Sequence, residues 1–384
     1  MTARYAAALS CHPVPAVAVG EVAGEVLEQL DGERPDLLVV FASPHLAGAF
    51  DDVVTGARRL LEPEVAIGTT AVAVAGGARE VEDGPALALF AAAWGGGAVT
   101  PVRLVTDVTS AGPVVRGVPG VPDEPAAARG TLLLLADPFS VPVVDVLRAG
   151  DGARGPIVIG GLASAARAPG GNRLALDDAV VTDGAVGVLL DPSVPVRAIV
   201  SQGCRPVGQP FTITDARDNV VLELGGRPAL TRLEELVAAA DDGERALLRQ
   251  GVHVGVVVDE HRVDFERGDF LVRNLLGADR STGALAVGDE VEVGQTLQFH
   301  VRDAGAADED LRALLAGAAA RAALLFTCNG RGSRFFDVAD HDTGVVDELL
   351  GPLPLAGAFC AGEIGPVGGR SFLHGFTASM ALFD

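Results

Sequence analysis

The sequence contains no lysine, so arginine supplies all 29 of its basic side chains, against 51 acidic ones. The formal net charge at pH 7 is −22. A surface of this sign repels phosphate backbones and anionic lipid headgroups, so we expect neither nucleic acid nor a membrane surface as a partner. The charge of the whole chain does not exclude a local arginine cluster, and a pocket that binds an anion stays open.

Aromatic residues make up only 4% of the chain, so we expect a core of alanine, valine and leucine with phenylalanine as the only common large side chain. Long apolar runs are also missing. The longest, Ala86–Trp94, falls short of the roughly 18 to 20 residues of a membrane span. The early run Tyr5–Cys11 is too short for the core of a signal peptide. We therefore expect a soluble, cytoplasmic protein.

Cysteine is scarce, and the four cysteines form no CxxC pair, which favours reduced thiols. The seven histidines show no HxH or HExxH pattern, and no phosphate-binding glycine motif joins a strand to a helix. The acidic stretch Asp337–Asp342 fits a charged loop before a helix that Asp342 or Thr343 caps. We predict no metal site and no cofactor.

Two long segments follow the same order of elements, and a third copy of its opening lies near the C-terminus. Each copy has a buried strand, a helix and a second buried strand. These elements lie at Asp36–Ser43, Leu46–Leu61 and Val65–Thr70, at Gly130–Asp137, Val141–Ala149 and Pro156–Ser164, and at Ala323–Asn329, Gly344–Leu350 and Pro354–Ile364. The tripeptide PVR, beginning at Pro101 and at Pro195, closes the first two copies.

Continuous apolar runs that alternate with helices predict an α/β fold. We expect two lobes with mixed sheets, helices covering them, and internally repeated β-α-β-hairpin units. The turn GGRP and a change of texture place the boundary near Gly225, which gives lobes of residues 1–224 and 225–384.

In each copy the second strand ends in small or polar residues, at Gly68–Thr70, Gly160–Ser164 and Ala361–Glu363. Ligands of α/β proteins gather where strand ends release backbone groups and glycine allows close approach. These three ends are candidates for the rim of a pocket. Tight turns without a ligand remain the alternative for each.

Six motifs in the C-terminal half resemble, in order and content, the C-terminal FIST domain. They are QGCRPVGQPFTIT (Gln202–Thr214), GGRPAL (Gly225–Leu230), DFLVRNLLGAD (Asp269–Asp279), GQTLQFHVRDA (Gly294–Ala304), FTCNGRG (Phe326–Gly332) and PLAGAFCAGEIGPVGGRSFLHGFT (Pro354–Thr377). Residues 36–200 resemble its N-terminal partner domain. The N-terminal match departs at VAIGTTAVAV (Val65–Val74), where the family has a turn ending in Gly-Glu and this chain has no such glutamate.

The resemblance implies a ligand-sensing role in signal transduction, with amino acids or similar small metabolites as ligands. We find no kinase, cyclase, receiver or F-box segment in the sequence, so we expect an output through a separate signalling partner or no output at all.

The candidate ligand-binding residues combine arginines with one carboxylate. Arg205 and Arg331 follow strands in glycine-flanked turns, where side chains tend to face a rim. Arg273, with Asn274, lies in an apolar run and needs an anionic partner, either Asp279 or Asp303 of the chain or a ligand carboxylate. We expect Arg302 to pair with Asp303.

Glu363, in AGEIGP directly after Gly362, either receives a ligand ammonium group or bonds the amides of its own turn. Cys328 and Asn329 stand at a strand end beside Arg331. This setting leaves open a lowered thiol pKa, and His374 offers an imidazole for a Cys-His pair. No third orienting group is evident, so we expect no catalytic residues.

The sequence thus predicts a pocket, formed by strand ends of both lobes, for a small zwitterionic or anionic metabolite. Its candidate residues are Arg205, Arg273, Asn274, Cys328, Asn329, Arg331, Gly362, Glu363 and His374. Two alternatives stay open: a thiol enzyme that uses Cys328, and an interaction scaffold with a vestigial pocket.

Overall fold

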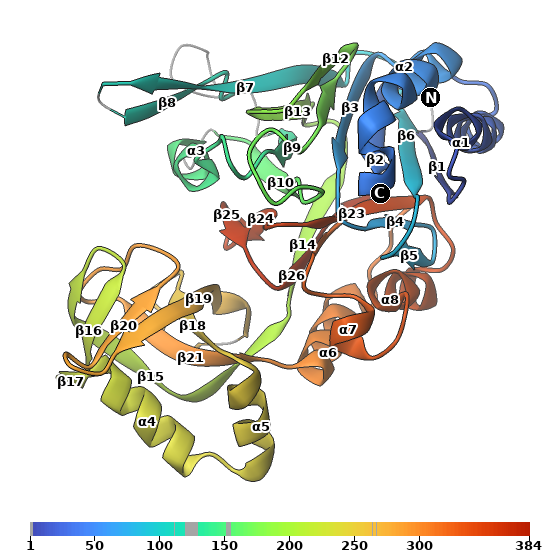
Figure 1. Ribbon diagram of the computed structural model, residues 1–384. Coiled ribbons are helices and arrows are strands. Elements are labelled where there is room, and N and C mark those ends of the chain that lie inside the picture. Colours follow the sequence, from blue (N-terminus) through green and yellow to red (C-terminus); the bar gives the residue numbers. More distant parts are fainter. Residues whose placement is uncertain (1–2, 111, 120–129, 151–154, 263, 266) are drawn as a thin grey trace. The chain divides into compact units, whose positions relative to one another are not determined.

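The computed structural model describes residues 3–110, 112–119, 130–150, 155–262, 264–265 and 267–384 (Figure 1). The chain folds into two compact units. Unit 1 consists of Met1–Val200, Leu311–Leu373 and Thr377–Asp384, and unit 2 of Ser201–Asp310 and His374–Phe376. The boundary predicted at residue 224/225 lies inside unit 2, because the third copy of the repeat folds with the first two.

Unit 1 contains three sheets. The first has the order β1 (Arg4–Ser10), β6 (Leu87–Ala93), β2 (Leu37–Ala42), β3 (Val65–Thr70), β11 (Leu174–Leu176), β12 (Ala179–Val181). The second is β25 (Arg370–His374), β24 (Glu363–Val367), β10 (Ile157–Leu162), β9 (Thr131–Ala136), β13 (Ala185–Leu190), β7 (Val99–Thr109), β8 (Gly112–Arg116). The third is β14 (Val196–Gln202), β26 (Thr377–Phe383), β22 (Ala322–Cys328), β23 (Leu355–Cys360), β4 (Val74–Gly76), β5 (Arg79–Val81).

Each sheet is built around a parallel pair of strands that a helical connection joins. The pairs are β2–β3, β9–β10 and β22–β23, and each has an antiparallel neighbour, respectively β6, β13 and β26. The connections are η1 (Pro44–Ala49) with α2 (Phe50–Leu61), α3 (Val143–Gly150), and α7 (Ser333–Phe336) with α8 (His341–Leu350). The α/β class with mixed sheets is therefore confirmed. The internal repeat of one β-α-β-hairpin unit stays a prediction.

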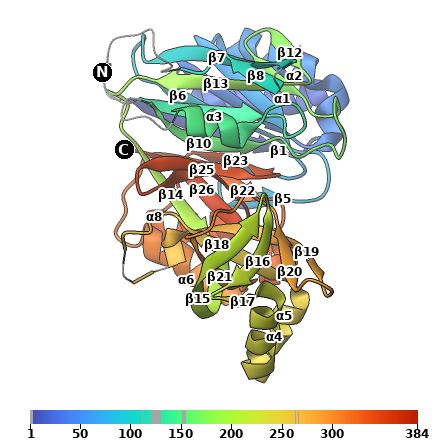
Figure 2. The same ribbon diagram turned by 90° about the vertical axis from the view of Figure 1, so that its left-hand side faces the viewer.

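The three hairpins are exchanged between the sheets in a cycle. The hairpin β4–β5 follows β3 in the chain but pairs with β23. Likewise β11–β12 follows β10 and pairs with β3, and β24–β25 follows β23 and pairs with β10 (Figure 1). Figure 2 shows the red β25 close to the green β10 of the same sheet. In each parallel pair, the second strand is thus extended by a hairpin from another part of the chain. This exchange interlocks the three sheets.

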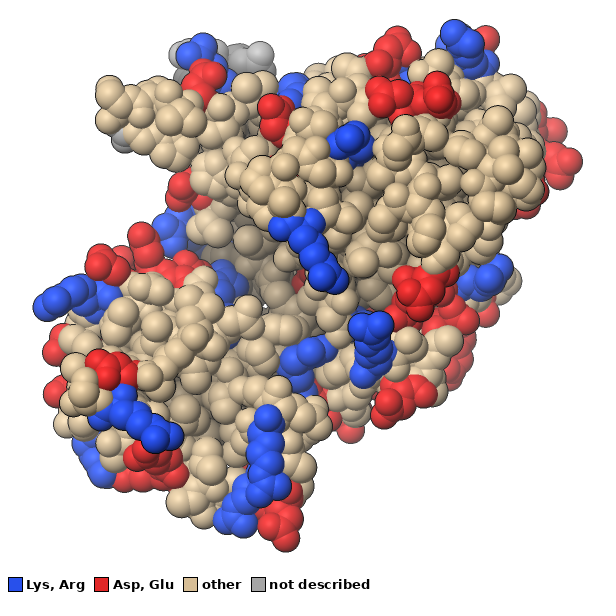
Figure 3. Space-filling model, in the orientation of Figure 1, with Lys and Arg blue, Asp and Glu red and all other residues tan. Residues whose placement is uncertain are grey.

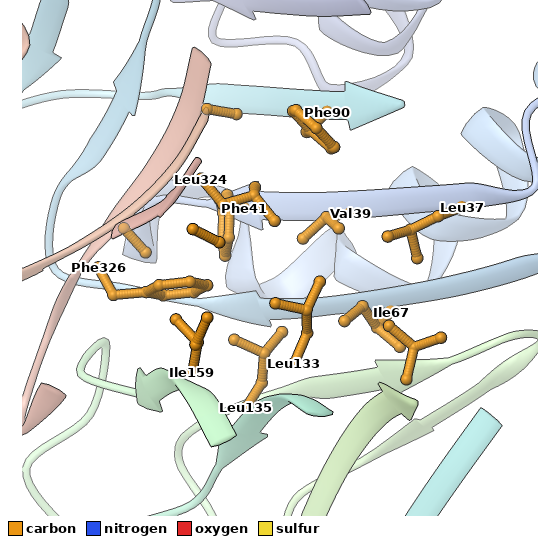
Figure 4. Packing of buried hydrophobic residues seen from close by; sticks show 14 of the residues in the cluster. Leu37, Val39, Phe41, Ile67, Phe90, Leu133, Leu135, Ile159, Leu324 and Phe326 are labelled. Carbon is orange, nitrogen blue, oxygen red and sulfur yellow. The ribbon is translucent and has the colours of Figure 1, made fainter. Parts of the chain in front are cut away.

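One apolar core joins the inner faces of the three sheets. Phe41, Leu133 and Phe326, one from each sheet, belong to the same buried cluster, and the rings of Phe41 and Phe326 meet edge to face at 6.1 Å (Figure 4). A second cluster packs α1 (Pro15–Gln29) and α2 on the other face of the first sheet. Alanine, valine and leucine fill most of these positions, as the composition predicts.

Gly160, on β10, is required where β10 lies between β9 and β24. Its φ is +154°, and an added Cβ would lie 1.9 Å from the Leu134 carbonyl oxygen. Only glycine tolerates both conditions. The adjacent Gly161 makes room for Cys360, whose Sγ would lie 2.3 Å from an added Cβ. The two glycines thus allow β24 to pair with β10.

Unit 2 is a β-barrel with helices beside it. Its strands follow the order β15 (Cys204–Arg217), β21 (Thr296–Arg302), β18 (Val252–Val257), β19 (Phe270–Asp279), β20 (Ala284–Val287), β16 (Val220–Leu224), β17 (Arg227–Pro228). Pairing of β15 with β16 closes the ring around the core of this unit. The helices are α4 (Ala229–Ala239), α5 (Asp242–Gln250) and the short η2 (Arg267–Asp269), and α6 (Ala304–Leu315) leads back to unit 1.

Charged side chains of both signs are interspersed on the face drawn in Figure 3. Among the helices that the structure describes, none has the length and hydropathy needed to cross a bilayer.

Candidate functional site

The ends of the three second strands meet in unit 1. The Val72 amide, just beyond β3, donates to Ser164 Oγ (2.9 Å), and the Ser164 amide donates to the Thr70 carbonyl (3.4 Å). The Ala361 amide, beyond β23, donates to the Leu162 carbonyl (3.0 Å). The predicted rim segments thus lie together, but hydrogen bonds join them to one another.

A buried ion pair lies beside this junction at the end of β22. Arg331 donates from Nε to Asp342 Oδ2 (2.8 Å) and from Nη2 to Oδ1 (2.7 Å), and both side chains are essentially inaccessible to solvent, 0% and 2% exposed. Thr327 Oγ1 donates to Asp342 Oδ2 (2.7 Å), and His341 Nδ1 lies 2.9 Å from Oδ1. The two-point geometry and the extra bonds are what a buried pair needs to offset its desolvation.

The ion pair keeps both Asp342 and Arg331 ionised. Burial alone would raise the pKa of Asp342, but the Arg331 guanidinium holds that pKa well below its usual value. Burial likewise acts to lower the pKa of Arg331, and Asp342 more than offsets it, so this pKa lies above its usual value. The expectation that Arg331 faces an open rim is wrong, because Asp342, on the first turn of α8, draws the side chain inward. Asp342 therefore serves Arg331, while Asp340 takes the N-cap position of α8.

Glu80 is a member of this site that the sequence did not reveal. It lies on β5 and reaches the site because the β4–β5 hairpin pairs with β23. Its Oε1 accepts from the Thr343 amide (3.0 Å), and its own amide donates to Asp340 Oδ1 (2.6 Å). Burial, reinforced by the negative charge of Asp342, raises the pKa of Glu80 to about 8. No local pattern around Glu80 signals this role, because its partners are more than 250 residues away.

Glu363, the candidate carboxylate, begins β24 and is fully buried. Its Oε2 accepts from both the amide (3.1 Å) and the hydroxyl (2.9 Å) of Thr377. Burial raises the pKa of Glu363 to about 8, although Thr377, Arg331 and Cys328 partly offset it. The carboxyl is therefore mostly protonated at pH 7. Its hydrogen bonds go to the strand β26 rather than to its own turn.

Cys328 and Cys360 end the parallel strands β22 and β23 and occupy the same register position. Both are buried, and burial raises the pKa of Cys360 well above its ordinary value. The Gly330 amide donates to Cys328 Sγ (3.5 Å). Asn329 is exposed directly after Cys328, and Gly362 is buried directly before Glu363. Unit 1 thus brings together Cys328, Asn329, Arg331, Gly362 and Glu363.

Arg331 and Glu363 each keep one side-chain atom without a hydrogen-bond partner. Arg331 Nη1 and Glu363 Oε1 are both buried and both unsatisfied, as is Glu80 Oε2. The Arg331 and Glu363 side chains are close enough to influence each other's pKa. An unsatisfied buried polar atom costs about 1–3 kcal/mol, and more when it belongs to a charged group. We call Thr327, Cys328, Arg331, Asp342 and Glu363 the strand-end cluster.

The other four predicted residues belong to unit 2, where the arginines have carboxylate partners. Arg205 Nε donates to Asp303 Oδ2 (2.7 Å). The Arg302 guanidinium lies over the ring of Phe376, 5.0 Å from its centroid, and its pairing with Asp303 stays a prediction. Arg205 was predicted to bind a ligand carboxylate, but in the structure it binds the carboxylate of Asp303.

Arg273 also has a protein partner, but a different one from those predicted. Its Nε donates to Asp289 Oδ2 (2.7 Å). Its neighbour Asn274 lies opposite His253 on β18. His374, the last residue of β25, is buried and is assigned to unit 2.

Two surface hollows lie outside the strand-end cluster. One, of about 570 Å³, lies between α1 and α2 and is lined mainly by apolar residues, among them Val19, Val53 and Leu60. The other, of about 580 Å³, lies on α4 and includes Leu233 and Val237. The first also includes Asp52 and Arg59, and the second Glu234 and Arg280. Neither includes a buried charged side chain, so we take the strand-end cluster as the candidate site.

The comparisons with known proteins agree with the motifs. Residues 36–227 match the FIST N domain and residues 229–366 match the FIST C domain, so the chain belongs to the FIST family. FIST domains are sensory domains of signal transduction. The junction between the two matches falls close to the boundary predicted at residue 224/225, although the compact units of the fold divide the chain differently.

Mycobacterial proteins are similar to this chain along almost its whole length. Uncharacterized protein Rv0628c of Mycobacterium tuberculosis is 43% identical over 389 residues, which cover 99% of each chain. Uncharacterized protein Mb0898c of Mycobacterium bovis is 44% identical over 370 residues, or 94% of each chain.

Proposed function

We propose that this protein is a small-ligand-binding sensory protein whose strand-end cluster takes an amino acid or a similar small zwitterionic or anionic metabolite. The observation that carries the proposal is the pair of buried, unsatisfied atoms Arg331 Nη1 and Glu363 Oε1. A guanidinium N–H donates strongly to a carboxylate, and a carboxylate accepts from an ammonium group. One ligand with both groups would satisfy both atoms.

The ionisation of the cluster supports this choice of ligand. Asp342 neutralises Arg331, and Glu363 is mostly neutral at pH 7 because its pKa is about 8. A ligand ammonium next to Glu363 would favour the ionised carboxyl and lower that pKa. A zwitterion would therefore bring one charge of each sign into a site that carries little net charge.

The proposed role is binding rather than catalysis. Arg331 and Glu363 are buried, whereas Asn329 on the adjoining turn is exposed. Entry of a ligand would require this turn to move, which would couple occupancy to a change of conformation. A separate signalling partner would read this change.

A thermal-shift screen of the full chain against amino acids and small carboxylates tests the proposal. A ligand at a hundredfold excess over its dissociation constant should raise the free energy of unfolding by about 2.7 kcal/mol. The variant Glu363→Gln should lose most of this gain for ammonium-bearing ligands. The matched control is Glu348→Gln, whose carboxylate pairs with Arg312 on the surface (2.9 Å). An unchanged shift in Glu363→Gln, or no shift with any compound, would contradict the proposal.

A further inference from the structure

The outer side of α1 and α2 forms an apolar hollow, away from the strand-end cluster. The two helices lie side by side on one face of the first sheet (Figure 1), and the hollow between them holds about 570 Å³. Two apolar residues that line it stay half exposed, Val14 at 49% and Leu60 at 50%. A concentration of apolar surface at a hollow is typical of an interaction site. We call the following residues the α1–α2 face: Val14, Ala16, Asp52, Gly56, Arg59 and Leu60.

Gly56 keeps the hollow open at its floor. It lies where α2 passes α1, and an added Cβ would come within 3.2 Å of Val19 Cγ1. A side chain at this position would therefore begin to fill the space between the two helices. Because the glycine leaves this space free, a side chain of another molecule has room to enter it.

Asp52 and Arg59 place charges of opposite sign at the hollow. They are seven residues apart on α2, which is two turns, so they share one face of the helix roughly 10.5 Å apart along its axis. Both are exposed, and among the described residues neither has a hydrogen-bond or ion-pair partner for its side chain. The adjacent Arg58, by contrast, binds Asp177 and Asp178. The α1–α2 face therefore carries one acid and one base that the chain itself does not pair.

We propose that the α1–α2 face is a dimer interface and that its partner is the same face of a second copy of this chain. Contacts across a two-fold axis are reciprocal, so a self-complementary surface is what such a dimer needs. If α2 packs antiparallel on α2 of the second copy, with the axis beside Thr55 and Gly56, Asp52 of each copy lies opposite Arg59 of the other. Two equivalent ion pairs then form, one on each side of the axis.

Leu60 is the side chain that enters the hollow in this arrangement. It faces the first turn of α2 in the second copy, where Ala49 and Val53 line the hollow. Its insertion removes the exposed part of Leu60, together with that of Val14, from water, and this burial of apolar surface stabilises the dimer. The two ion pairs contribute mainly to specificity, because any other register of the helices would leave the charges unpaired or bring like charges together.

Sedimentation velocity of the full chain over a wide range of concentrations tests the interface by charge reversal. The parent should form dimers. Asp52→Arg and Arg59→Asp should each raise the dimer dissociation constant by roughly tenfold or more, because each brings like charges face to face. An equal mixture of these two variants should form heterodimers, since opposite charges then meet across the axis, and the double variant Asp52→Arg, Arg59→Asp should dimerise as the parent does. The matched control, Glu348→Gln, changes a surface charge on α8 and should leave the dimer unchanged.

The mixture separates a lost interface from a lost fold. Two misfolded variants could not restore association when combined, so heterodimers show that both are folded and that the charges meet across the axis. A dimer that survives both single reversals would place the interface elsewhere and overturn the proposal, as would a mixture that stays monomeric. A parent that is monomeric at every concentration also overturns it and leaves the α1–α2 face to a different protein. None of these outcomes depends on the ligand of the strand-end cluster.

Discussion

Replacing Asp342 by asparagine should lower the free energy of unfolding by about 3–5 kcal/mol, because it leaves the Arg331 guanidinium buried without a negative partner. The two side chains are joined by two hydrogen bonds of 2.7 and 2.8 Å with almost no access to solvent. Asparagine keeps the size and one acceptor oxygen, so the loss measures charge rather than volume. Chemical denaturation of the parent and the variant, followed by circular dichroism, gives the difference.

Two further variants show whether burial is the cause. Glu348→Gln breaks the surface pair with Arg312 and should cost no more than about 1 kcal/mol. The double variant Arg331→Met, Asp342→Leu removes both charges and should recover much of the loss. A small effect of Asp342→Asn, equal to that of Glu348→Gln, would mean that the ion pair is open to water.

The stability of the chain should fall between about pH 5 and pH 8 because of Glu363. Its pKa is about 8 in the folded chain and near 4.5 when the chain unfolds. Over this window the unfolded state releases the proton while the folded state keeps it, so stability decreases as pH rises. The contribution of Glu363 to the free energy of unfolding is fully present below the pKa of the unfolded state. It is completely lost above the pKa of the folded state. From pH 5 to pH 8 this one group lowers the free energy of unfolding by roughly 3–4 kcal/mol.

Glu363→Gln isolates this contribution, because glutamine has the same shape and does not titrate. Urea denaturation at several pH values should give a flatter profile for the variant than for the parent. Glu80, whose pKa is also about 8, remains in both proteins and contributes the same slope to each. Parallel profiles for the two proteins would show that Glu363 is ionised at pH 5 in the folded chain.

The sequence predicted the local units well because their signals are local. The strands β2, β9 and β22 are almost entirely buried, so each reads as an unbroken apolar run, and a helix follows at short distance. Strand ends after Gly68, Gly160 and Gly362 marked where chemistry would gather. The helix α1 lies outside the three strand-helix-strand copies, and the sequence analysis did not predict it. The closure of the barrel in unit 2 was not predicted either.

The partners of the charged residues were out of reach for a physical reason. Glycine-flanked turns usually face solvent, which favoured an open Arg331, but Asp342 eleven residues later draws it inward. Glu80 arrives on a hairpin that pairs with a strand far away in the sequence, and the cyclic exchange of hairpins leaves no local pattern. Arg273 pairs with Asp289, 16 residues later, because the fold of the barrel, rather than the spacing along the sequence, decides which side chains meet.

The central claim is that a zwitterionic ligand completes the strand-end cluster through Arg331 and Glu363. Calorimetric titration at pH 7 with a ligand from the screen, repeated in two buffers of different ionisation enthalpy, counts the protons exchanged on binding. With a pKa of about 8, Glu363 is about nine-tenths protonated before binding, so we expect the release of about 0.9 proton per ligand, abolished in Glu363→Gln. Binding without proton release, or the same release from Glu363→Gln, would contradict it.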